Sequence, residues 1–461
     1  MLTSEKITKD LMNVLPKSNV LTSLAERYAY SQDAMNVKEI KNIADAVVFV
    51  ENIEQIQSVV RLANKHKTPI ICRGAGTNVV GACVPEKNGI ILNFSKMNKI
   101  LDINPSNMTA RVQAGVVVGD LQKAVEKYNL CYPPDPSNLA VSTIGGSIAQ
   151  ASAGAKAFKY GSTKDYVLDL LVVTANGEIL KTGSSTIKNA TGYNLNTLFI
   201  GSEGTLGIVV EATLKLIPQP EKQVVLMGYF DDIEKSIQAV NSIIEHKITP
   251  ATIDFMDKNA IQTVEDFKHI GLLTDKECAL IVEVDGLSCA VDYQREIIER
   301  ILMDFGAVEI QSSKNEEDYE KIWSARRSSM GACVRLKPNV TTDDLIVPRE
   351  NLSKLVLGVR EICAKYDLTV CMVGHVGDGS VHPQIPIDYN DEDEYSRYKK
   401  AKSEIYQLTA SLGGLLSGEH GVGLLKRENI GLVINEVALN YMRQIKKTFD
   451  PNNILNPYKI F

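Results

Sequence analysis

The first half of the chain is constrained most by three irregular stretches that are nearly free of charge, the first stiffened by three prolines and the other two rich in glycine and other small residues. They span residues 132–138, 142–161 and 200–218, between short segments with strand character. Long stretches of this composition are uncommon as plain loops and usually surround a flat or extended ligand. Together with a further glycine loop, RGAGTNVVG at residues 73–81, they favour a buried ligand that carries a diphosphate.

The 73–81 loop has the composition of a phosphate cradle. Gly74 and Gly76 allow backbone amides to approach a phosphate, and Arg73 is a charge partner for it. The loop differs from the nicotinamide-cofactor fingerprint because Val79 stands where the third glycine is expected, and no acidic residue follows a second strand about twenty positions later. A purely structural turn is the alternative.

The pattern of the chain changes after residues 218–220. Up to that point short strands dominate, whereas the second part alternates strands and helices with ordinary surface charge, which suits an α+β sandwich with helices on one face of a sheet. The tail, residues 449–461, ends apolar and is expected to dock back on the body. The expected strands are 68–72, 89–94, 109–114, 167–174, 178–181, 224–229, 253–256, 279–284 and 307–311, and the expected helices are 53–66, 232–246 and 291–304.

Length and charge exclude several classes of protein. A chain of 461 residues predicts two or three packed units. The net charge of −6 argues against nucleic acid and anionic membranes as partners. No apolar run reaches the ~18 to 20 residues that span a bilayer, and the start lacks a signal-peptide core, so a cytoplasmic protein is expected. The eight cysteines show no CxxC spacing, which disfavours zinc ribbons and iron–sulfur clusters and predicts mostly buried thiols.

Two stretches of the second half, GHVGDGSVHPQ at residues 374–384 and SGEHG at residues 417–421, hold three of the six histidines. Residues 371–375 and 381–385 are typical of strands, and the turn at residues 377–380 has the glycines that supply the positive φ angles of a hairpin. The glycines around both stretches let the backbone approach another group closely, which a plain hairpin does not require.

Such a hairpin places His375 and His382 on facing arms, and Glu419 could complete a site of two histidines and one carboxylate. This set leaves positions for water or substrate, as expected of a catalytic metal. His420, next in sequence, would remain available for proton transfer. The alternative is two histidines that flank a turn, with an exposed glutamate.

A helical segment at residues 322–330 carries Arg326 and Arg327 beside the only tryptophan, Trp323. Adjacent residues on a helix point in different directions, so at most one of these arginines should face a ligand carboxylate. Two solvated arginines are the alternative.

From about residue 38 to its end, the chain resembles the FAD-linked oxidases of the vanillyl-alcohol-oxidase type, specifically the branch of D-lactate dehydrogenases and glycolate oxidase large subunits. The resemblance is carried by the motifs RGAGTN (73–78), YGSTKDYVLDL (160–170), KNATGYNL (188–195), GSEGTLGI (201–208), GHVGDGSVH (374–382), SGEHGVG (417–423) and DPNNILNP (450–457). It implies an α+β protein with an N-terminal helical segment (1–37), an FAD-binding domain (38–220), a ferredoxin-like substrate or cap domain (221–415) and a C-terminal helical segment returning to the flavin (416–461).

The resemblance also implies roles for individual residues. His375, His382 and Glu419 match the family's divalent-metal ligands, His420 matches the base beside the flavin, and Arg326 matches the arginine that binds the substrate carboxylate. The residues that match those holding the FAD pyrophosphate or lining the flavin are Arg73, Gly74, Ala75, Gly76, Thr77, Asn78, Gly81, Pro134, Asp135, Pro136, Ser137, Thr143, Gly146, Ser152, Gly154 and Ile208.

Two departures from the family pattern refine this picture. Some relatives bind FAD covalently through a histidine of the first loop, where this chain has Thr77, with His66 as the nearest histidine, so non-covalent FAD is expected. Relatives that act on dicarboxylates place a lysine and an asparagine near the metal, where this chain has Thr342 and Gln384. A small monocarboxylate is therefore favoured.

The resemblance implies oxidation of a small 2-hydroxy acid, with D-lactate to pyruvate first and glycolate or D-2-hydroxyglutarate as alternatives. The metal would be iron, zinc or manganese. The implied electron acceptor is an electron-transfer flavoprotein, which could link the reaction to NAD and ferredoxin, or a separate iron–sulfur subunit. A metal-dependent hydrolase and a flavin-dependent transferase are the alternatives from other classes.

Overall fold

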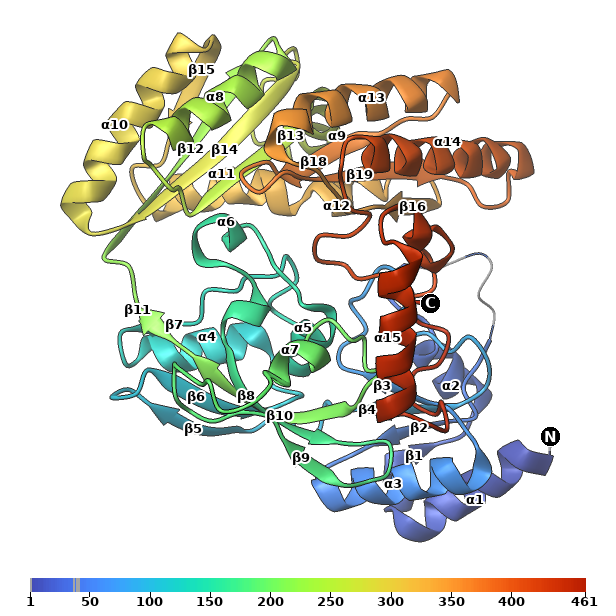
Figure 1. Ribbon diagram of the computed structural model, residues 1–461. Helices are drawn as coiled ribbons and strands as arrows, with labels where there is room; N and C mark the ends of the chain where they lie inside the picture. Colours follow the sequence, from blue (N-terminus) through green and yellow to red (C-terminus); the bar gives the residue numbers. More distant parts are fainter. Residues whose placement is uncertain (1, 36–37, 39–41) are drawn as a thin grey trace. The chain divides into compact units, whose positions relative to one another are not determined.

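The computed structural model describes residues 2–35, 38 and 42–461, and its chain forms two compact units (Figure 1). The first unit comprises Met1–Ala153, Ser162–Gln219 and Glu419–Phe461, and the second comprises Gly154–Gly161 and Pro220–Gly418. Each unit is therefore built from separate pieces of the chain. The predicted boundary at residue 37 lies outside the described residues.

The first unit begins with a small sheet of order β1-β2-β4-β3, in which β2, β4 and β3 are parallel. Helix α3 connects β2 to β3 and buries Ile56, Val59, Val60 and Ala63, one apolar stripe at helical spacing. The elements here are α1 (Leu2–Val14), β1 (Val20–Leu21), α2 (Leu24–Tyr30), β2 (Ala46–Phe49), α3 (Ile53–His66), β3 (Ile70–Arg73) and β4 (Ile90–Asn93).

A second, antiparallel sheet of the first unit has the order β5-β6-β10-β8-β9. Strand β10 alternates buried and half-buried residues along its whole length, because one face of the sheet covers the core. The elements are β5 (Ile100–Asn104), β6 (Thr109–Gln113), α4 (Val118–Glu126), β7 (Leu130–Cys131), α5 (Ile144–Gln150), β8 (Val167–Val173), β9 (Ile179–Lys181), α7 (Asn196–Phe199), β10 (Ile208–Lys215), β11 (Ile217–Pro218) and α15 (Glu436–Phe449).

The glycine-rich stretch at residues 142–161 is more regular than its composition indicates. It contains α5, which Thr143 caps by accepting a hydrogen bond from the Gly146 amide at 3.2 Å. A Cβ atom on Gly145 would lie 2.7 Å from Cβ of Ala114, so the small residues let this helix lie close against the strand region behind it.

The second unit is built on one long antiparallel sheet of order β15-β12-β14-β13-β18-β19-β16, with β17 paired to β19. Its strands are β12 (Lys222–Phe230), β13 (Thr252–Asp257), β14 (Cys278–Gly286), β15 (Ala307–Ser312), β16 (Asn339–Thr342), β17 (Leu345–Ile346), β18 (Cys371–His375) and β19 (Ser380–Ile387). Its helices are α6 (Ala157–Tyr160), α8 (Ile233–Glu245), α9 (Lys258–Lys268), α10 (Ser288–Asp304), α11 (Glu316–Arg327), α12 (Ser329–Cys333), α13 (Leu352–Lys365) and α14 (Glu392–Ser411).

Helices cover both faces of this sheet, so the prediction that they lie on one face was wrong. Trp323 of α11 and Ile261 of α9 share a buried cluster with Met227 of β12. The next residue of β12, Gly228, points to the opposite face, where an added Cβ would lie 3.2 Å from Leu302 of α10. Helical periodicity shows that a helix has a buried stripe, but it does not show which sheet face receives the stripe.

Segment Gly154–Gly161 belongs to the second unit although both of its flanks belong to the first. Lys159 pairs with Asp285 of β14, and the Tyr160 hydroxyl donates to the same carboxylate at 2.8 Å. Gly154 and Gly161, at the two ends, have φ angles of 144° and 81°. These are left-handed values that glycine adopts readily, so the chain can turn sharply at both junctions.

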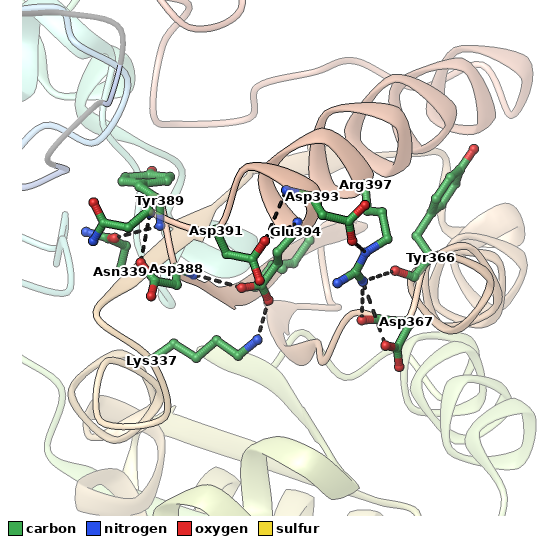
Figure 2. A network of polar contacts seen from close by, with 12 residues as sticks. Lys337, Asn339, Tyr366, Asp367, Asp388, Tyr389, Asp391, Asp393, Glu394 and Arg397 are labelled. Carbon is green, nitrogen blue, oxygen red and sulfur yellow. Dashed lines mark hydrogen bonds and ion pairs between the residues drawn. The ribbon is translucent and has the colours of Figure 1, made fainter.

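The acidic run at the start of α14 has a structural role (Figure 2). Asp391 caps the helix by accepting hydrogen bonds from the backbone amides of Asp393 and Glu394, both at 3.0 Å. Glu394 pairs with Lys337 and accepts from the Asp388 amide. Acidic side chains in a first helical turn also face the positive end of the helix dipole, so they stabilise α14.

The C-terminal tail docks on the first unit, as predicted. The Ile70 amide donates to the Ile454 carbonyl oxygen at 2.7 Å, and the Asn456 amide donates to the Ile70 carbonyl oxygen at 2.8 Å. The tail therefore lies along β3, just before the 73–81 loop. All eight cysteines are free thiols, and five of them are buried, in line with the prediction. Among the described helices, none has the length and apolar character needed to cross a membrane.

Candidate functional site

The predicted hairpin is confirmed as β18 and β19. Their antiparallel register places Val373 opposite His382, and the rings of His375 and His382 lie with their centroids 5.1 Å apart at 76°. The turn is tight, because a Cβ atom on Gly374 would lie 2.3 Å from the Ser380 carbonyl oxygen. Both histidines are buried, at 7% and 6% exposure, so this is not a pair of solvated turn residues.

Ligand atoms of His375, His382 and Glu419 all lie within 4.8 Å of one another. Glu419 follows Gly418 directly in the chain, so it lies at the junction where the second unit ends and the last piece of the first unit begins. Within the described ranges, one group of three or more histidine, cysteine or acidic side chains lies close enough together to hold a metal ion, and it is this one. Two imidazoles and one carboxylate suit zinc, iron or manganese, so the donor set fits the implied metal.

Asp254 of β13 contacts His375 directly. Its Oδ1 lies 2.7 Å from Nδ1 of His375, and the two residues are opposite each other in the register of β13 and β18. Burial raises the pKa of Asp254, but the charges of His375 and Arg326 together outweigh this effect. The pKa therefore lies below its ordinary value. A histidine that donates Nδ1–H to a carboxylate carries its lone pair on Nε2, the atom that can bind a metal.

The two adjacent arginines of α11 diverge, as the helix geometry predicts. Nε of Arg326 lies 2.6 Å from Oδ2 of Asp254, and the Arg326 side chain is only 12% exposed. Arg327 pairs instead with Glu320, and its side chain is 48% exposed. In the part of the chain that the structure describes, the outer nitrogens of Arg326 donate no hydrogen bond, so they can bind an anion.

Glu283 fixes the position of α11, and sequence reasoning did not single it out. This fully buried carboxylate accepts hydrogen bonds from the Tyr319 hydroxyl and from Nε1 of Trp323, both at 2.9 Å, and lies 3.2 Å from Nζ of Lys156. Arg326 follows Trp323 by one helical turn. A lone glutamate within the apolar strand CALIVEVDG was the available sign, because a buried acid requires partners.

The 73–81 loop of the first unit presents a row of backbone amides. Among the described residues, the amides of Gly74, Ala75, Gly76 and Thr77 donate no hydrogen bond to protein, as a phosphate cradle requires. Gly76 has a φ angle of 77°, and a Cβ atom there would lie 2.0 Å from Nη2 of Arg73. The loop geometry therefore fits the implied FAD pyrophosphate.

Arg73 supports this loop from inside the protein. Its guanidinium donates to the Gln32 carbonyl oxygen and lies over the ring of Tyr30, 5.7 Å from the centroid. Gly81, also in the predicted cofactor set, donates its amide to Oδ2 of Asp33 at 2.7 Å. The role of Arg73 as a charge partner of a phosphate stays a prediction.

Four of the residues predicted to bind FAD come together around a cavity of about 60 Å³ in the first unit. Arg73, Gly74, Thr143 and Gly146 line it, and a Cβ atom on Gly74 would lie 2.2 Å from Oγ1 of Thr143. The remaining members are more dispersed in the fold. Pro134, Asp135, Pro136 and Ser137 lie in the irregular segment after β7, Ser152 follows α5, Ile208 begins β10, and Gly154 belongs to the second unit.

His66 and Thr77 bear on how FAD is attached. Nε2 of His66 lies 2.9 Å from Oδ2 of Asp10, so this histidine is held by α1. Oγ1 of Thr77 lies 3.4 Å from Oγ of Ser142. That FAD is bound non-covalently stays a prediction. It is compatible with a His66 side chain that contacts Asp10 and with a threonine at position 77.

The first unit holds the backbone of His420. Asn78, a predicted cofactor residue, donates its side-chain amide to the His420 carbonyl oxygen. Glu203, which sequence reasoning cited only within a motif, accepts hydrogen bonds from the amides of Val422 at 2.7 Å and Gly423 at 2.9 Å. Burial raises the pKa of Glu203, while these amides stabilise its charged form.

Comparisons with known proteins agree with this architecture. The family model described as "FAD linked oxidases, C-terminal domain" matches residues 219–460, and the one described as "FAD binding domain" matches residues 44–183. The glycolate oxidase subunit GlcD of Bacillus subtilis (strain 168) is 41% identical over 99% of this chain and 97% of its own length. A D-lactate dehydrogenase of Anaerostipes hadrus is 32% identical over 90% of this chain and 89% of its own length.

A solved structure of p-cresol methylhydroxylase with substrate bound shares the fold, with a TM-score of 0.85 at 18% identity, over 99% of this chain and 96% of that one. Such a neighbour shows a vanillyl-alcohol-oxidase-type fold alone, whereas the family models and the relatives above 30% identity cover both units. The chain therefore belongs to the FAD-linked oxidases, as an FAD-dependent oxidoreductase of the group that contains glycolate oxidase subunit GlcD and D-lactate dehydrogenase.

Proposed function

We propose that this chain oxidises a small 2-hydroxy monocarboxylate, with D-lactate as the first candidate, to the corresponding 2-oxo acid. One observation carries the proposal. In the second unit, the buried acid Asp254 contacts both His375 and Arg326, and His375 lies beside His382. The outer nitrogens of Arg326 can bind a carboxylate. A metal ligand pair and a carboxylate-binding arginine are the two groups that a 2-hydroxy acid needs for bidentate recognition.

FAD, when bound, supplies the acceptor for the hydride that leaves C2, and a divalent cation held by His375, His382 and Glu419 supplies positive charge. The amides of residues 74–77 would hold the FAD pyrophosphate. Arg326 donates hydrogen bonds from its outer nitrogens to the substrate carboxylate and orients it. His420 takes the hydroxyl proton on an imidazole nitrogen, a general-base role that contributes roughly 10²- to 10⁴-fold in rate.

The residues beside the histidine pair favour a monocarboxylate. Thr342 of β16 lies opposite Gln384 of β19, and Oε1 of Gln384 accepts a hydrogen bond from Ser329. These neutral side chains offer no charge to a second substrate carboxylate, which disfavours D-2-hydroxyglutarate. Glycolate is the second candidate, because the relative at 41% identity is named a glycolate oxidase subunit.

We further propose that the electrons leave to a separate protein, either an electron-transfer flavoprotein or an iron–sulfur subunit. The name of the 41% relative, a subunit, supports an assembly of more than one chain. With an electron-transfer flavoprotein as acceptor, lactate oxidation would be linked to NAD and ferredoxin.

An anaerobic absorbance titration tests the proposed function. Purified protein should show a flavin spectrum that bleaches on addition of D-lactate, less readily with glycolate, and not with D-2-hydroxyglutarate. A colourless protein would instead favour a metal-dependent hydrolase. A yellow protein that no 2-hydroxy acid bleaches would favour a flavin-dependent transferase.

A further inference from the structure

Asp254 divides its two carboxylate oxygens between two different partners. Oδ1 lies 2.7 Å from Nδ1 of His375, and Oδ2 lies 2.6 Å from Nε of Arg326. The side chain is fully buried, so water does not compete for either oxygen. One acid therefore contacts both a candidate metal ligand and the candidate carboxylate-binding group.

The fold fixes both partners around this acid. His375 lies directly opposite Asp254 in the register of β13 and β18, so the backbone ladder sets their separation. Arg326 arrives from α11, which Glu283 of the next strand, β14, holds through Trp323. The arrangement is therefore built by elements that lie far apart in the sequence, not by a local turn.

Each contact has a chemical consequence. By accepting Nδ1–H, Asp254 selects the His375 tautomer whose Nε2 carries the lone pair that a metal requires. By its ion pair with Nε at 2.6 Å, it anchors the Arg326 guanidinium and leaves the outer nitrogens for an anion. Loss of the acid would leave a mobile imidazole and a guanidinium without its buried counter-charge, which is costly in a buried site.

We propose that Asp254 is a positioning residue that couples metal affinity to substrate-carboxylate affinity, by orienting His375 with one oxygen and Arg326 with the other. The inference rests on the proposed function, since it takes His375 as a metal ligand and Arg326 as the carboxylate-binding group. It predicts that changes at one buried acid weaken two binding equilibria that are measured separately.

The test uses the purified holoprotein and two readouts besides turnover. The first is the affinity of chelator-treated protein for Zn²⁺, measured by calorimetry. The second is the affinity of the metal-free protein for pyruvate, followed by perturbation of the flavin spectrum. Asp254→Ala should weaken Zn²⁺ binding by about 10- to 100-fold, as for other residues that orient a metal-bound histidine, and should weaken pyruvate binding at least tenfold.

Asp254→Asn keeps the shape of the side chain but has only one acceptor oxygen, so it can satisfy His375 or Arg326, not both. It should weaken at least one of the two affinities. Asp257→Asn is the matched control, because Asp257 is a buried acid of the same strand whose Oδ1 alone accepts from the Ala260 and Met372 amides, as an asparagine oxygen can. This control should stay within twofold of the parent protein in both affinities.

Single-partner variants separate the two readouts. His375→Ala should lose Zn²⁺ affinity and keep pyruvate binding in the metal-free protein, whereas Arg326→Ala should do the reverse. A folded Asp254→Ala variant that loses only one affinity, or neither, would overturn the coupling while the proposed function stands. A parent protein that binds neither Zn²⁺ nor pyruvate would overturn the proposed function and this inference together.

Discussion

The side-chain amide of Asn78 donates a hydrogen bond to the backbone carbonyl oxygen of His420 at 3.1 Å. Oδ1 of the same side chain accepts hydrogen bonds from the amides of Val80 and Ala82, both at 3.0 Å. One residue thus shapes the end of the glycine loop and also holds the segment that carries the candidate base.

Replacing Asn78 with aspartate should separate these two tasks. The acceptor oxygen is kept, so the shape of the loop should be preserved, but the donor to His420 is lost. The added negative charge beside the predicted pyrophosphate loop should also lower FAD content, so the rate is compared per bound flavin. A single hydrogen bond contributes about 0.5 to 1.5 kcal/mol, so flavin reduction by D-lactate should slow by about 2- to 10-fold. Stopped-flow reduction together with the flavin-to-protein ratio would measure this, and an unchanged rate would contradict the holding role.

His420→Ala should retain FAD and lose reduction by substrate. Without a general base the rate of flavin bleaching by D-lactate should fall by roughly 10²- to 10⁴-fold. His246→Ala is the control, because His246 is an exposed residue at the end of α8 that bonds only to the Ser242 carbonyl oxygen in the described chain. Normal bleaching in the His420 variant would exclude this residue as the base.

Glu203→Gln should destabilise the first unit. Oε1 of Glu203 accepts from the amides of Val422 and Gly423, and Oε2 accepts from the Gly423 amide as well. Glutamine keeps one of these oxygens but removes the negative charge and places an –NH₂ donor against the Gly423 amide. Loss of a hydrogen bond to a charged group costs about 1.5 to 3 kcal/mol. Thermal unfolding would measure the loss, with the exposed Glu178→Gln as a control expected to change stability by less than about 0.5 kcal/mol. Equal melting temperatures for the two variants would refute the role of Glu203.

Asp257 should make stability depend on pH in the mildly acidic range. Burial raises the pKa of Asp257 from 3.8 to about 6. The folded protein therefore holds a proton that the unfolded chain releases, so this contribution is fully present below pH 3.8 and is lost as pH rises through 6. The free energy of unfolding should fall by up to about 3 kcal/mol over that interval.

Asp257→Asn should flatten this pH profile, and denaturant titrations at pH 4, 5, 6 and 7 would show it. Part of the slope should persist in the variant, because burial also raises the pKa of Asp33 to about 6. An identical slope in parent and variant would show that Asp257 does not titrate in this range.

The sequence predicted the site best where local composition decides the structure. The 53–66 helix has the predicted bounds because Asn52 caps it and its apolar residues form one stripe. The hairpin that carries His375 and His382 follows from its glycine turn. Both are decided by residues that are neighbours in the chain.

Asp254 and Glu203 could not be assigned roles from the sequence for the opposite reason. Asp254 meets His375 across 121 positions, and Glu203 meets Val422 across 219. Each is a lone acid among apolar or small residues, and its function depends on strand register and helix packing. Such an acid shows that a partner must exist, but only the folded structure shows which residue it is.

The division of the chain also has a consequence for how it can be made. The chain passes between the two units at four places, after Ala153, Gly161, Gln219 and Gly418. A fragment that stops at Gln219 would leave β3 without Leu455 beside it and the Asn78 amide without its acceptor. Truncation at Gln219 is therefore expected to yield an incomplete first unit, because the last piece of that unit is encoded after the whole of the second.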